Sequence, residues 1–248
     1  MTEFLLLTLY APIASWGDIA VGQLRGSWHC PSRSAVMGLV AAALGTDRED
    51  QEGHDALEVG YGLAVRLDRP GTAMVDYHTA QTVPRSVARR VPGRPRAVLL
   101  AAGKPETMLS WRTYRQDALA TVALWARSGA RWTLEQLGDE LRSPTFVLYA
   151  GRKASPLGLP LNPEIVRTET LLEALLRRSP RIAALEWPAF GRPDETVVEV
   201  AHDPCEGFAS GLQALRREVR RDAAANRTRW QFAERVVEVG VVPTGGAA

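Results

Sequence analysis

The chain has 248 residues, of which 46% are hydrophobic, and thirty basic against 28 acidic residues give it a net charge of +2. This length suits one large or two small domains with a buried core, and the near-neutral total does not by itself indicate a nucleic-acid-binding protein. Two cysteines, Cys30 and Cys205, are too few for a disulfide framework. The amino-terminal apolar run has no basic segment before it and stops at Pro12, so we expect no signal peptide, no membrane span and a cytoplasmic location.

The first half of the chain predicts three strands and one helix. The continuous apolar run Phe4–Tyr10 is typical of a central strand that is covered on both faces. In "CPSRSAVMGLVAAALG" either Ser32 or Ser34 can cap a helix, which Gly45 ends. Two further core strands are predicted at Gly60–Asp68 and Ala118–Ala126.

The second half predicts two helices and three shorter strands. Thr133 and Gln136 have the spacing of a capping box at the start of "TLEQLGDELRSP", and Thr170 with Glu173 caps a helix that we expect to run through Arg178. The expected strands are Thr145–Tyr149, Thr196–Ala201 and Val236–Val242.

This order of elements predicts an α+β fold. Strand, helix, strand, insertion, strand, helix, strand is the order of a ferredoxin-like βαββαβ unit. We place this domain at residues 1–160, with an insertion at about 80–108. Residues 161–248 are long enough for a smaller carboxy-terminal region.

The insertion is strongly basic. Between Asp76 and Lys104 there is no acidic residue, and the basic ones are Arg85, Arg89, Arg90, Arg94, Arg96 and Lys104. Prolines at 84, 92 and 95 prevent a single helix, because proline lacks the N–H donor and clashes inside a helix. A segment of this kind has no core of its own and is stabilised by a polyanion, although a solvated loop face is the simpler alternative.

Arginine replaces lysine almost everywhere, since Lys104 and Lys153 are the only lysines. Arginine favours bidentate phosphate contacts and stacking on bases. A GC-rich genome would explain the overall bias, but it would not explain why arginine gathers at Arg85–Lys104 and again at Arg216–Arg229.

Three other segments are candidates for phosphate or base contacts. "SWRTYRQD" (110–117) mixes aromatic residues with Arg112 and Arg115, a pattern that single-stranded RNA binding uses, although core packing of the aromatic residues is an equal alternative. The loop "GRK" (151–153) combines a permissive glycine with two cations. Arg33 adds a cation at a helix start, where backbone N–H groups already favour an anion.

His78, in "DYHT", is the histidine whose neighbours best suit a site. With Tyr77 as proton donor it could act as a general base on a ribose hydroxyl; the favoured alternative is that it hydrogen-bonds or stacks on RNA without cleaving it. The pairs His29-Cys30 and His202-x-x-Cys205 lack the spacing of structural zinc sites, so we expect no metal. Nucleotide-cofactor loops and nucleophile elbows are absent from the sequence, so we expect no cofactor.

Several short motifs together resemble one protein family. They are "APIASWG" (11–17), "PSRSAVMGLVAAALG" (31–45), "DYHT" (76–79), "SWRTYRQDALATVAL" (110–124), "YAGRKASPL" (149–157) and, more faintly, "RWQFAER" (229–235). In this order they resemble the CasD family, subunits of the type I-E CRISPR surveillance complex Cascade within the repeat-associated mysterious protein (RAMP) superfamily.

The resemblance implies a ferredoxin-like (RRM-like) RAMP domain with an inserted basic β-hairpin, the thumb, and a small carboxy-terminal β-rich subdomain. It further implies that the chain grips the repeat-derived 5′ handle of the CRISPR guide RNA and caps the backbone filament. The expected partners are that RNA, the Cascade backbone and large subunits and, through the complex, target DNA. The resemblance implies no membrane partner and no catalytic activity, because a different subunit of the type I-E group cuts the RNA.

Carried over position by position, the resemblance assigns a set of RNA contacts. They are Arg33, Ser34, His78, Thr79, Arg112, Arg115, Tyr149, Gly151, Arg152 and Lys153. The thumb arginines Arg85, Arg89 and Arg90 join this set by charge, although they do not align closely with the family pattern. Residues 207–227 are longer and richer in arginine than the family pattern, and the sequence offers no account of them.

Two other functions stay open on the sequence alone. One is a metal-independent endoribonuclease that processes CRISPR repeat RNA with His78. The other is a scaffold that contacts only protein partners.

Overall fold

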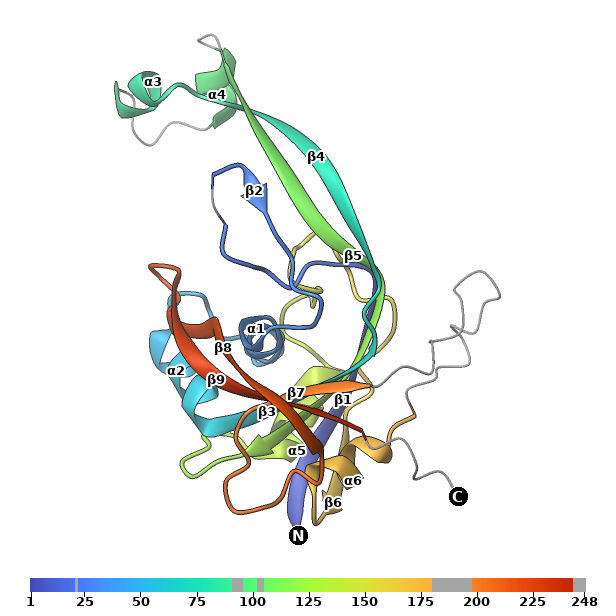
Figure 1. The fold of residues 1–248 in the computed structure, drawn as a ribbon. Coiled ribbons are helices and arrows are strands. Elements are labelled where there is room, and N and C mark those ends of the chain that lie inside the picture. Colours follow the sequence, from blue (N-terminus) through green and yellow to red (C-terminus); the bar gives the residue numbers. More distant parts are fainter. Residues whose placement is uncertain (21, 91–95, 102–104, 180–197, 243–248) are drawn as a thin grey trace.

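A computed structural model describes residues 1–20, 22–90, 96–101, 105–179 and 198–242. Within these residues, helices combine with a nine-stranded, mostly antiparallel sheet in the order β6-β1-β5-β3-β7-β9-β8, with β2 and β4 also paired to β5 (Figure 1). The strands are β1 (Thr2–Ala14), β2 (Leu24–Arg25), β3 (Tyr61–Arg69), β4 (Thr72–Thr82), β5 (Glu106–Ala126), β6 (Glu164–Thr168), β7 (Glu199–His202), β8 (Gln213–Asn226) and β9 (Gln231–Val241). The helices are α1 (Arg33–Ala43), α2 (Gln51–Gly60), α3 (Arg85–Arg90), α4 (Arg96–Ala101), α5 (Leu134–Arg142) and α6 (Leu171–Leu176). No helix in the described ranges is long and apolar enough to cross a membrane.

Strand β1 is buried on both faces, as its continuous apolar run predicts. Successive side chains of a strand point to opposite faces, so Leu5 and Leu7 pack under α1 and α5, while Phe4 and Leu6 pack with α6 on the other side. β1 pairs antiparallel with β5 and with β6, which places it inside the sheet. The predicted strand at Phe4–Tyr10 is therefore confirmed, and the observed strand is longer at both ends.

The predicted helix starts are confirmed by their caps. The Ser32 side chain accepts a hydrogen bond from the Ala35 N–H and caps α1, so Ser32 and not Ser34 is the cap. Thr133 and Gln136 form both hydrogen bonds of the capping box at α5. The Thr170 side chain caps α6, which ends at Leu176, earlier than predicted.

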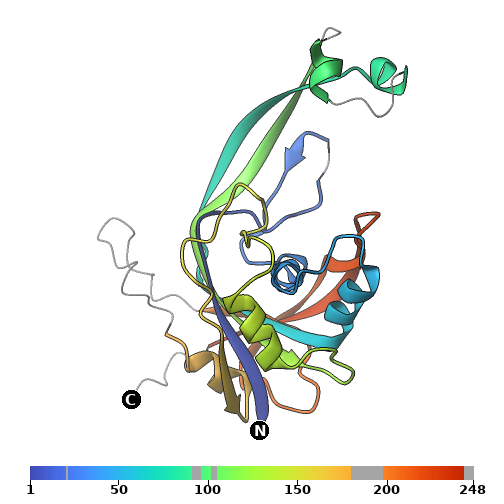
Figure 2. The same cartoon turned by 180° about the vertical axis from the view of Figure 1, so that it is seen from behind.

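β4 and β5 form a long two-stranded arm that leaves the body of the molecule (Figures 1 and 2). Their register runs without interruption from Thr72 opposite Gln116 to Thr82 opposite Glu106. At the far end the chain makes two short helices, α3 and α4, instead of one, as the prolines predict. Pro92, Pro95, Arg94 and Lys104 lie outside the described residues. We use "arm" for residues 72–116.

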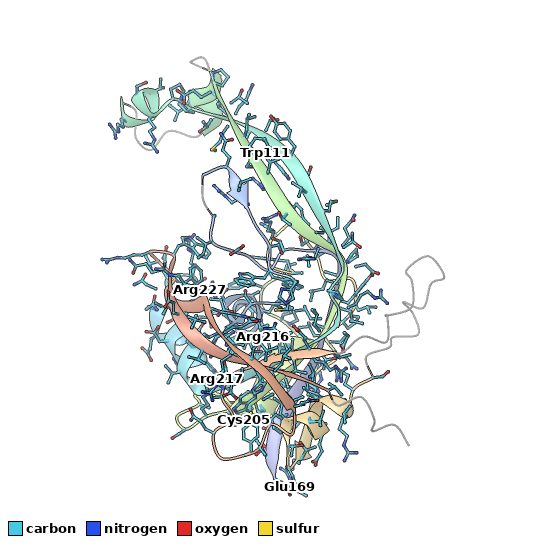
Figure 3. All side chains as sticks on the ribbon, in the orientation of Figure 1. Trp111, Glu169, Cys205, Arg216, Arg217 and Arg227 are labelled. Carbon is cyan, nitrogen blue, oxygen red and sulfur yellow. The ribbon has the colours of Figure 1, made fainter. Side chains whose placement is uncertain are left out.

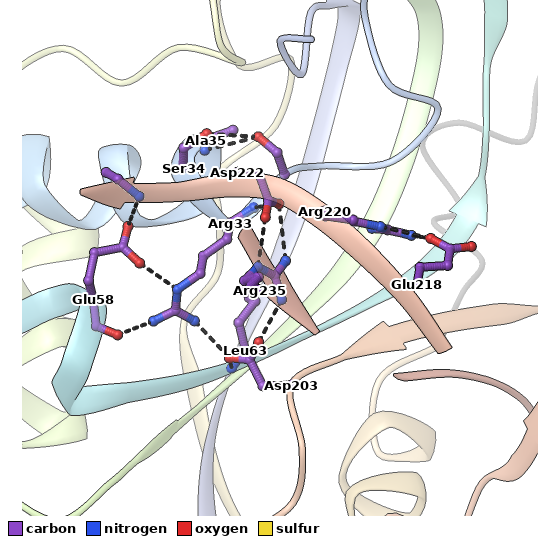
Figure 4. Close-up of polar contacts among 12 residues, drawn as sticks. Arg33, Ser34, Ala35, Glu58, Leu63, Asp203, Glu218, Arg220, Asp222 and Arg235 are labelled. Atoms are coloured by element: carbon purple, nitrogen blue, oxygen red, sulfur yellow. Dashed lines mark hydrogen bonds and ion pairs between the residues drawn. The ribbon is translucent and has the colours of Figure 1, made fainter. Parts of the chain in front are cut away.

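At the edge of the sheet formed by β8, strands β8 and β9 make a hairpin. A buried ionic cluster holds this hairpin against α1 (Figure 4). Asp203, which follows β7, accepts hydrogen bonds from Arg33 at 2.7 Å and from Arg235 at 2.6 Å. Arg235 also donates to Asp222 at 2.7 Å, and Asp222 accepts the backbone N–H of Arg33. Arg33, Asp203 and Asp222 are all at least 95% buried. Because a buried charge without a partner is costly, these residues depend on one another for stability.

The strand predicted at Thr145–Tyr149 is wrong. The segment is irregular and makes an isolated bridge between Tyr149 and Pro156. Its backbone donors are used elsewhere: the N–H groups of Thr145 and Phe146 donate to carbonyls at the end of α1. The last carbonyls of a helix have no partner within the helix, so they hold this segment away from the sheet.

The elements after residue 161 add to the same sheet. β6 pairs with β1 and β7 pairs with β3, and β9 and β8 follow. The predicted last strand at Val236–Val242 lies within β9 except for its final residue, and Thr196 and Val197 of the other predicted strand lie outside the described residues. The domain boundary near residue 160 stays a prediction.

Candidate nucleic-acid interface

The two faces of the arm carry different side chains. Residues directly opposite each other in the register share a face, so His78 lies beside Ser110 and Asp76 lies beside Arg112. His78 Nε2 is 2.7 Å from a carboxylate oxygen of Asp76. The other face carries Tyr77 against Trp111, whose ring centroids are 5.4 Å apart.

This alternation separates some of the residues that the sequence groups together. Arg112 and Arg115 are three residues apart in one unbroken strand, so their side chains point to opposite faces. For the same reason Thr79 lies on the face opposite His78. Tyr77 and His78 are likewise on opposite faces, so the pairing of Tyr77 as acid with His78 as base is wrong.

The loop 149–153 lies against the His78 face of the arm. Arg152 stacks over the ring of buried Tyr114, 4.5 Å from its centroid, and donates to the carbonyls of Thr113 and Arg25, each at 3.2 Å. Arg152 therefore joins the loop to β5 and β2. Tyr114 is a packing residue, as one of the two alternatives expects, whereas Trp111 remains 37% exposed.

Gly151 allows this loop to pass close to the chain after β1. It has φ +82°, and a Cβ at this position would collide with the Ser15 carbonyl oxygen. Both conditions require glycine. Beside it, Lys153 is exposed and Tyr149 is 38% exposed, so both side chains can reach a ligand.

Arg33 does not belong to this surface, and its predicted contact with RNA is wrong for the guanidinium. The side chain is buried and donates to Glu58, to Asp203 and to the carbonyl of Tyr61. The helix start attracts an anion as predicted, but the anion is the chain's own Asp222.

Arg85 and Arg89 are exposed on α3 at the end of the arm. Neither forms an ion pair with any of the residues that the structure describes. Arg90 lies on the same helix, but its side chain is outside the described part of the chain.

A groove begins where the 149–153 loop meets α1. It consists of two adjoining cavities of about 600 and 540 Å³ that share several lining residues, Ser34 among them. The larger cavity is also lined by Tyr149, Gly151 and Arg152. The groove thus gathers four of the predicted contacts. His78 and Arg112 are not among its lining residues and lie farther along the arm.

Sequence reasoning missed the opposite wall of the groove. Arg48 and Arg227 line the larger cavity, and Trp230 and Phe232 line both. The faint motif "RWQFAER" (229–235) was the available signal, but only the tertiary structure brings it beside α1.

Comparison with known proteins identifies the family to which the chain belongs. Residues 4–238 match the family described as CRISPR-associated protein (Cas_Cas5). The chain belongs to this family. "CRISPR system Cascade subunit CasD" of Escherichia coli (strain K12) is 30% identical over 188 residues, which is 73% of this chain and 79% of that protein. The resemblance to the CasD family is thereby confirmed.

Two solved structures are similar over nearly the whole of this Cas5 family chain. The first is a "CRISPR RNA-guided surveillance complex", with a TM-score of 0.59 and 25% identity over 97% of this chain and 90% of that one. The second, "Crystal structure of Cas protein", has a TM-score of 0.59 and 26% identity over 97% and 95%. The mixed α/β fold is thus that of known Cas proteins.

The thiols of the two cysteine-containing pairs in this Cas5 family member have raised pKa values. Cys205 Sγ lies 3.7 Å from Nδ1 of His202, but burial raises the pKa of the Cys205 thiol to about 12. Burial also raises the pKa of Cys30. Across the described ranges, no three ligating side chains group together. The absence of a metal site stays a prediction from the sequence.

Proposed function

We propose that the chain is the CRISPR RNA-binding subunit of a Cascade complex, where it grips the repeat-derived 5′ handle of the guide RNA and caps the backbone filament. The observation that carries this proposal is the continuity of the His78 face of the arm with the groove at α1. Arg112 and Arg152 supply positive charge along that path, and exposed Lys153 follows Arg152 in the loop. A positive groove bordered by aromatic side chains is what proteins use to bind single-stranded nucleic acid.

In this proposal the arm is the thumb of the family, and its partners are guide RNA and the Cascade backbone and large subunits, with target DNA reached through the complex. The antiparallel order β6-β1-β5-β3, with α1 and α2 after β1 and α5 after β5, supports a ferredoxin-like RAMP unit. The exposed arginines of α3 support an arm that contacts a polyanion. Membership of type I-E and a cytoplasmic location stay predictions from the resemblance.

A double variant tests the RNA path. Lys153→Ala with Arg112→Ala removes two cations and leaves Arg152, which also holds the loop, in place. We expect weaker binding to an RNA that carries the handle and a salt-dependence slope lower by about 1.4, because each phosphate contact to a single strand contributes about 0.7. Fluorescence anisotropy measures the affinity and the slope from roughly 50 to 300 mM KCl, the range over which phosphate contacts weaken.

The matched control is Arg142→Ala with Arg167→Ala. These two arginines are also exposed, but each pairs with a carboxylate on α5 or at β1, away from the groove. If both double variants change the slope equally, the path is not the RNA site.

We propose that the chain binds this RNA without cutting it. Tyr77 points to the other face of the arm and does not converge with His78, which supports this proposal. Repeat RNA incubated with the protein in EDTA should stay intact. Cleavage that His78→Ala abolishes would establish the endoribonuclease instead. Equal RNA affinity of the full chain and of a variant lacking residues 82–104 would favour a scaffold.

A further inference from the structure

The turn of the β8–β9 hairpin holds a tryptophan in an unfavourable backbone conformation. Trp230 has φ +52°, a region that glycine and asparagine adopt far more readily than bulky residues. Its indole is nevertheless 54% exposed, so burial in a core does not offset the unfavourable backbone conformation. Residues held in such sparsely populated backbone regions cluster at active sites and ligand-binding positions.

The same turn contains an arginine with an incomplete set of partners. Arg227 is half-buried between the hairpin and α1, and Figure 3 shows it at the hairpin. Its guanidinium donates to the Ser34 carbonyl at 3.2 Å, its Nε has no hydrogen-bond partner, and no carboxylate in the described ranges forms an ion pair with it. The buried Arg33 and Arg220, in contrast, each pair with an acidic residue.

The missing partner of Arg227 points to an anionic ligand. Burial lowers the pKa of Arg227, and the charge of Glu58 opposes the shift. Buried cations in proteins are normally paired. Because Arg227 lines the larger cavity of the groove, an anion bound there can supply the counter-charge.

Aromatic side chains stand next to this cation. The Arg48 guanidinium lies 4.4 Å from the centroid of the Trp230 ring, and the Phe232 ring lies 6.3 Å away at 30°. Arg48, Arg227, Trp230 and Phe232 all line the larger cavity, so flat surfaces and positive charge occupy one site of about 600 Å³. A phosphate with an attached base matches this combination.

We propose that the β8–β9 turn is a nucleotide subsite, in which Arg227 and Arg48 bind a phosphate of single-stranded RNA and Trp230 stacks on the adjoining base. The inference rests on the proposed function, because the nucleotide belongs to the strand that lies in the groove. It adds a second wall of contacts, opposite the arm, and it gives residues 226–232 a role in RNA binding.

A pair of substitutions at Trp230 tests the stacking. Trp230→Gly removes the ring and relieves the positive φ, so we expect equal or higher thermal stability together with handle-RNA affinity lower by roughly 5- to 100-fold, the range for loss of a stacking aromatic. Trp230→Phe keeps a ring and should retain most of the affinity. Trp230→Gly that binds as tightly as the unchanged chain would overturn the subsite.

The RNA side of the contact is tested with the same handle RNA carrying one abasic nucleotide at a time. At one position, loss of the base should weaken binding to the unchanged chain. Loss of the same base should leave binding to Trp230→Gly unchanged. Equal losses for both proteins at every position would show that Trp230 stacks on no base.

The phosphate contact is tested with Arg227→Gln, which should lower the slope of affinity against salt by about 0.7. Arg217→Gln, an exposed and paired arginine of the same hairpin, is the control and should leave the slope unchanged. If Arg227→Gln loses thermal stability, exposed Arg48→Gln replaces it. A slope unchanged by the folded variant would contradict the phosphate site.

These results separate the subsite from the proposed function. If the unchanged chain binds handle RNA no better than an unrelated RNA of equal length, the proposed function fails. If it binds the handle and the variants bind equally well, only the subsite fails. Variants that bind RNA normally but no longer join the complex would assign the turn to a protein partner and overturn the proposal.

Discussion

Two arginine-rich hairpins of similar sequence character differ in how their charges are used. On the arm, Arg85 and Arg89 are exposed and have no acidic partner in the described ranges. On β8, Arg216 pairs with Glu199 and Glu218, and Arg217 pairs with Glu238. Figure 3 shows Arg216 and Arg217 on the body of the molecule and Trp111 on the arm.

The difference arises from the neighbouring strands. β8 has acidic residues within it and across from it on β9 and β7, because these strands lie in one sheet. The arm pairs with itself, with β2 and, at its base, with β1, and the basic segment contains no acidic residue. Arginine density in the sequence is therefore a poor guide to free positive charge, whereas the charge of the paired strands is a good one.

The largest expected effect is a loss of stability when the buried ionic cluster beneath the β8–β9 hairpin is disrupted. Asp203→Ala leaves Arg33 and Arg235 without a shared carboxylate inside the protein. We expect the free energy of unfolding to fall by about 3–5 kcal/mol, the cost of removing one partner of a buried pair. Urea unfolding followed by circular dichroism measures it. Glu238→Gln, which removes the carboxylate that pairs with exposed Arg217, is the control, and equal losses for the two variants would contradict the buried cluster.

The next largest effect is a loss of RNA affinity, without a change in stability, when the exposed arginines of the arm are removed. Arg85→Ala with Arg89→Ala should weaken handle-RNA binding about tenfold and lower the salt slope by about 1.4, without changing the unfolding midpoint. Arg216→Ala with Arg217→Ala removes the same charge from β8 and should change RNA affinity much less, since those charges are already neutralised. Anisotropy titrations compare the two. Equal effects would mean that arginine number, not pairing, decides RNA binding.

The smallest effect depends on pH. The hydrogen bond from Arg216 lowers the pKa of Glu199. A carboxylate with a lowered folded-state pKa stabilises the fold above its ordinary value of 4.5, and this stabilisation is lost as pH falls below it. The stability difference between the unchanged chain and Glu199→Gln should be below about 1 kcal/mol at pH 7 and vanish toward pH 3, because the pair is partly exposed. Urea midpoints measured at pH 3–7 test it, and a difference that does not vary with pH would refute the assignment.

Local signals in the sequence predict most elements well. The caps at Ser32, Thr133 and Thr170 and the central run at Phe4–Tyr10 act within a few residues, so their outcome needs little help from the rest of the chain. The strand predicted at Thr145–Tyr149 failed because α1, about a hundred residues earlier, takes up its backbone donors. Propensity cannot register a partner so distant in sequence.

The candidate site divides in the same way. The sequence by itself determined which segments carry the cations and the membership of the Cas5 family. Only the tertiary structure decided that Arg33 is neutralised by Glu58 and Asp203, and that Arg227 forms no ion pair within the described part of the chain. The physical reason is that a charge is free or paired according to what lies within a few ångströms of it, and in this chain those neighbours come from strands and helices far apart in sequence.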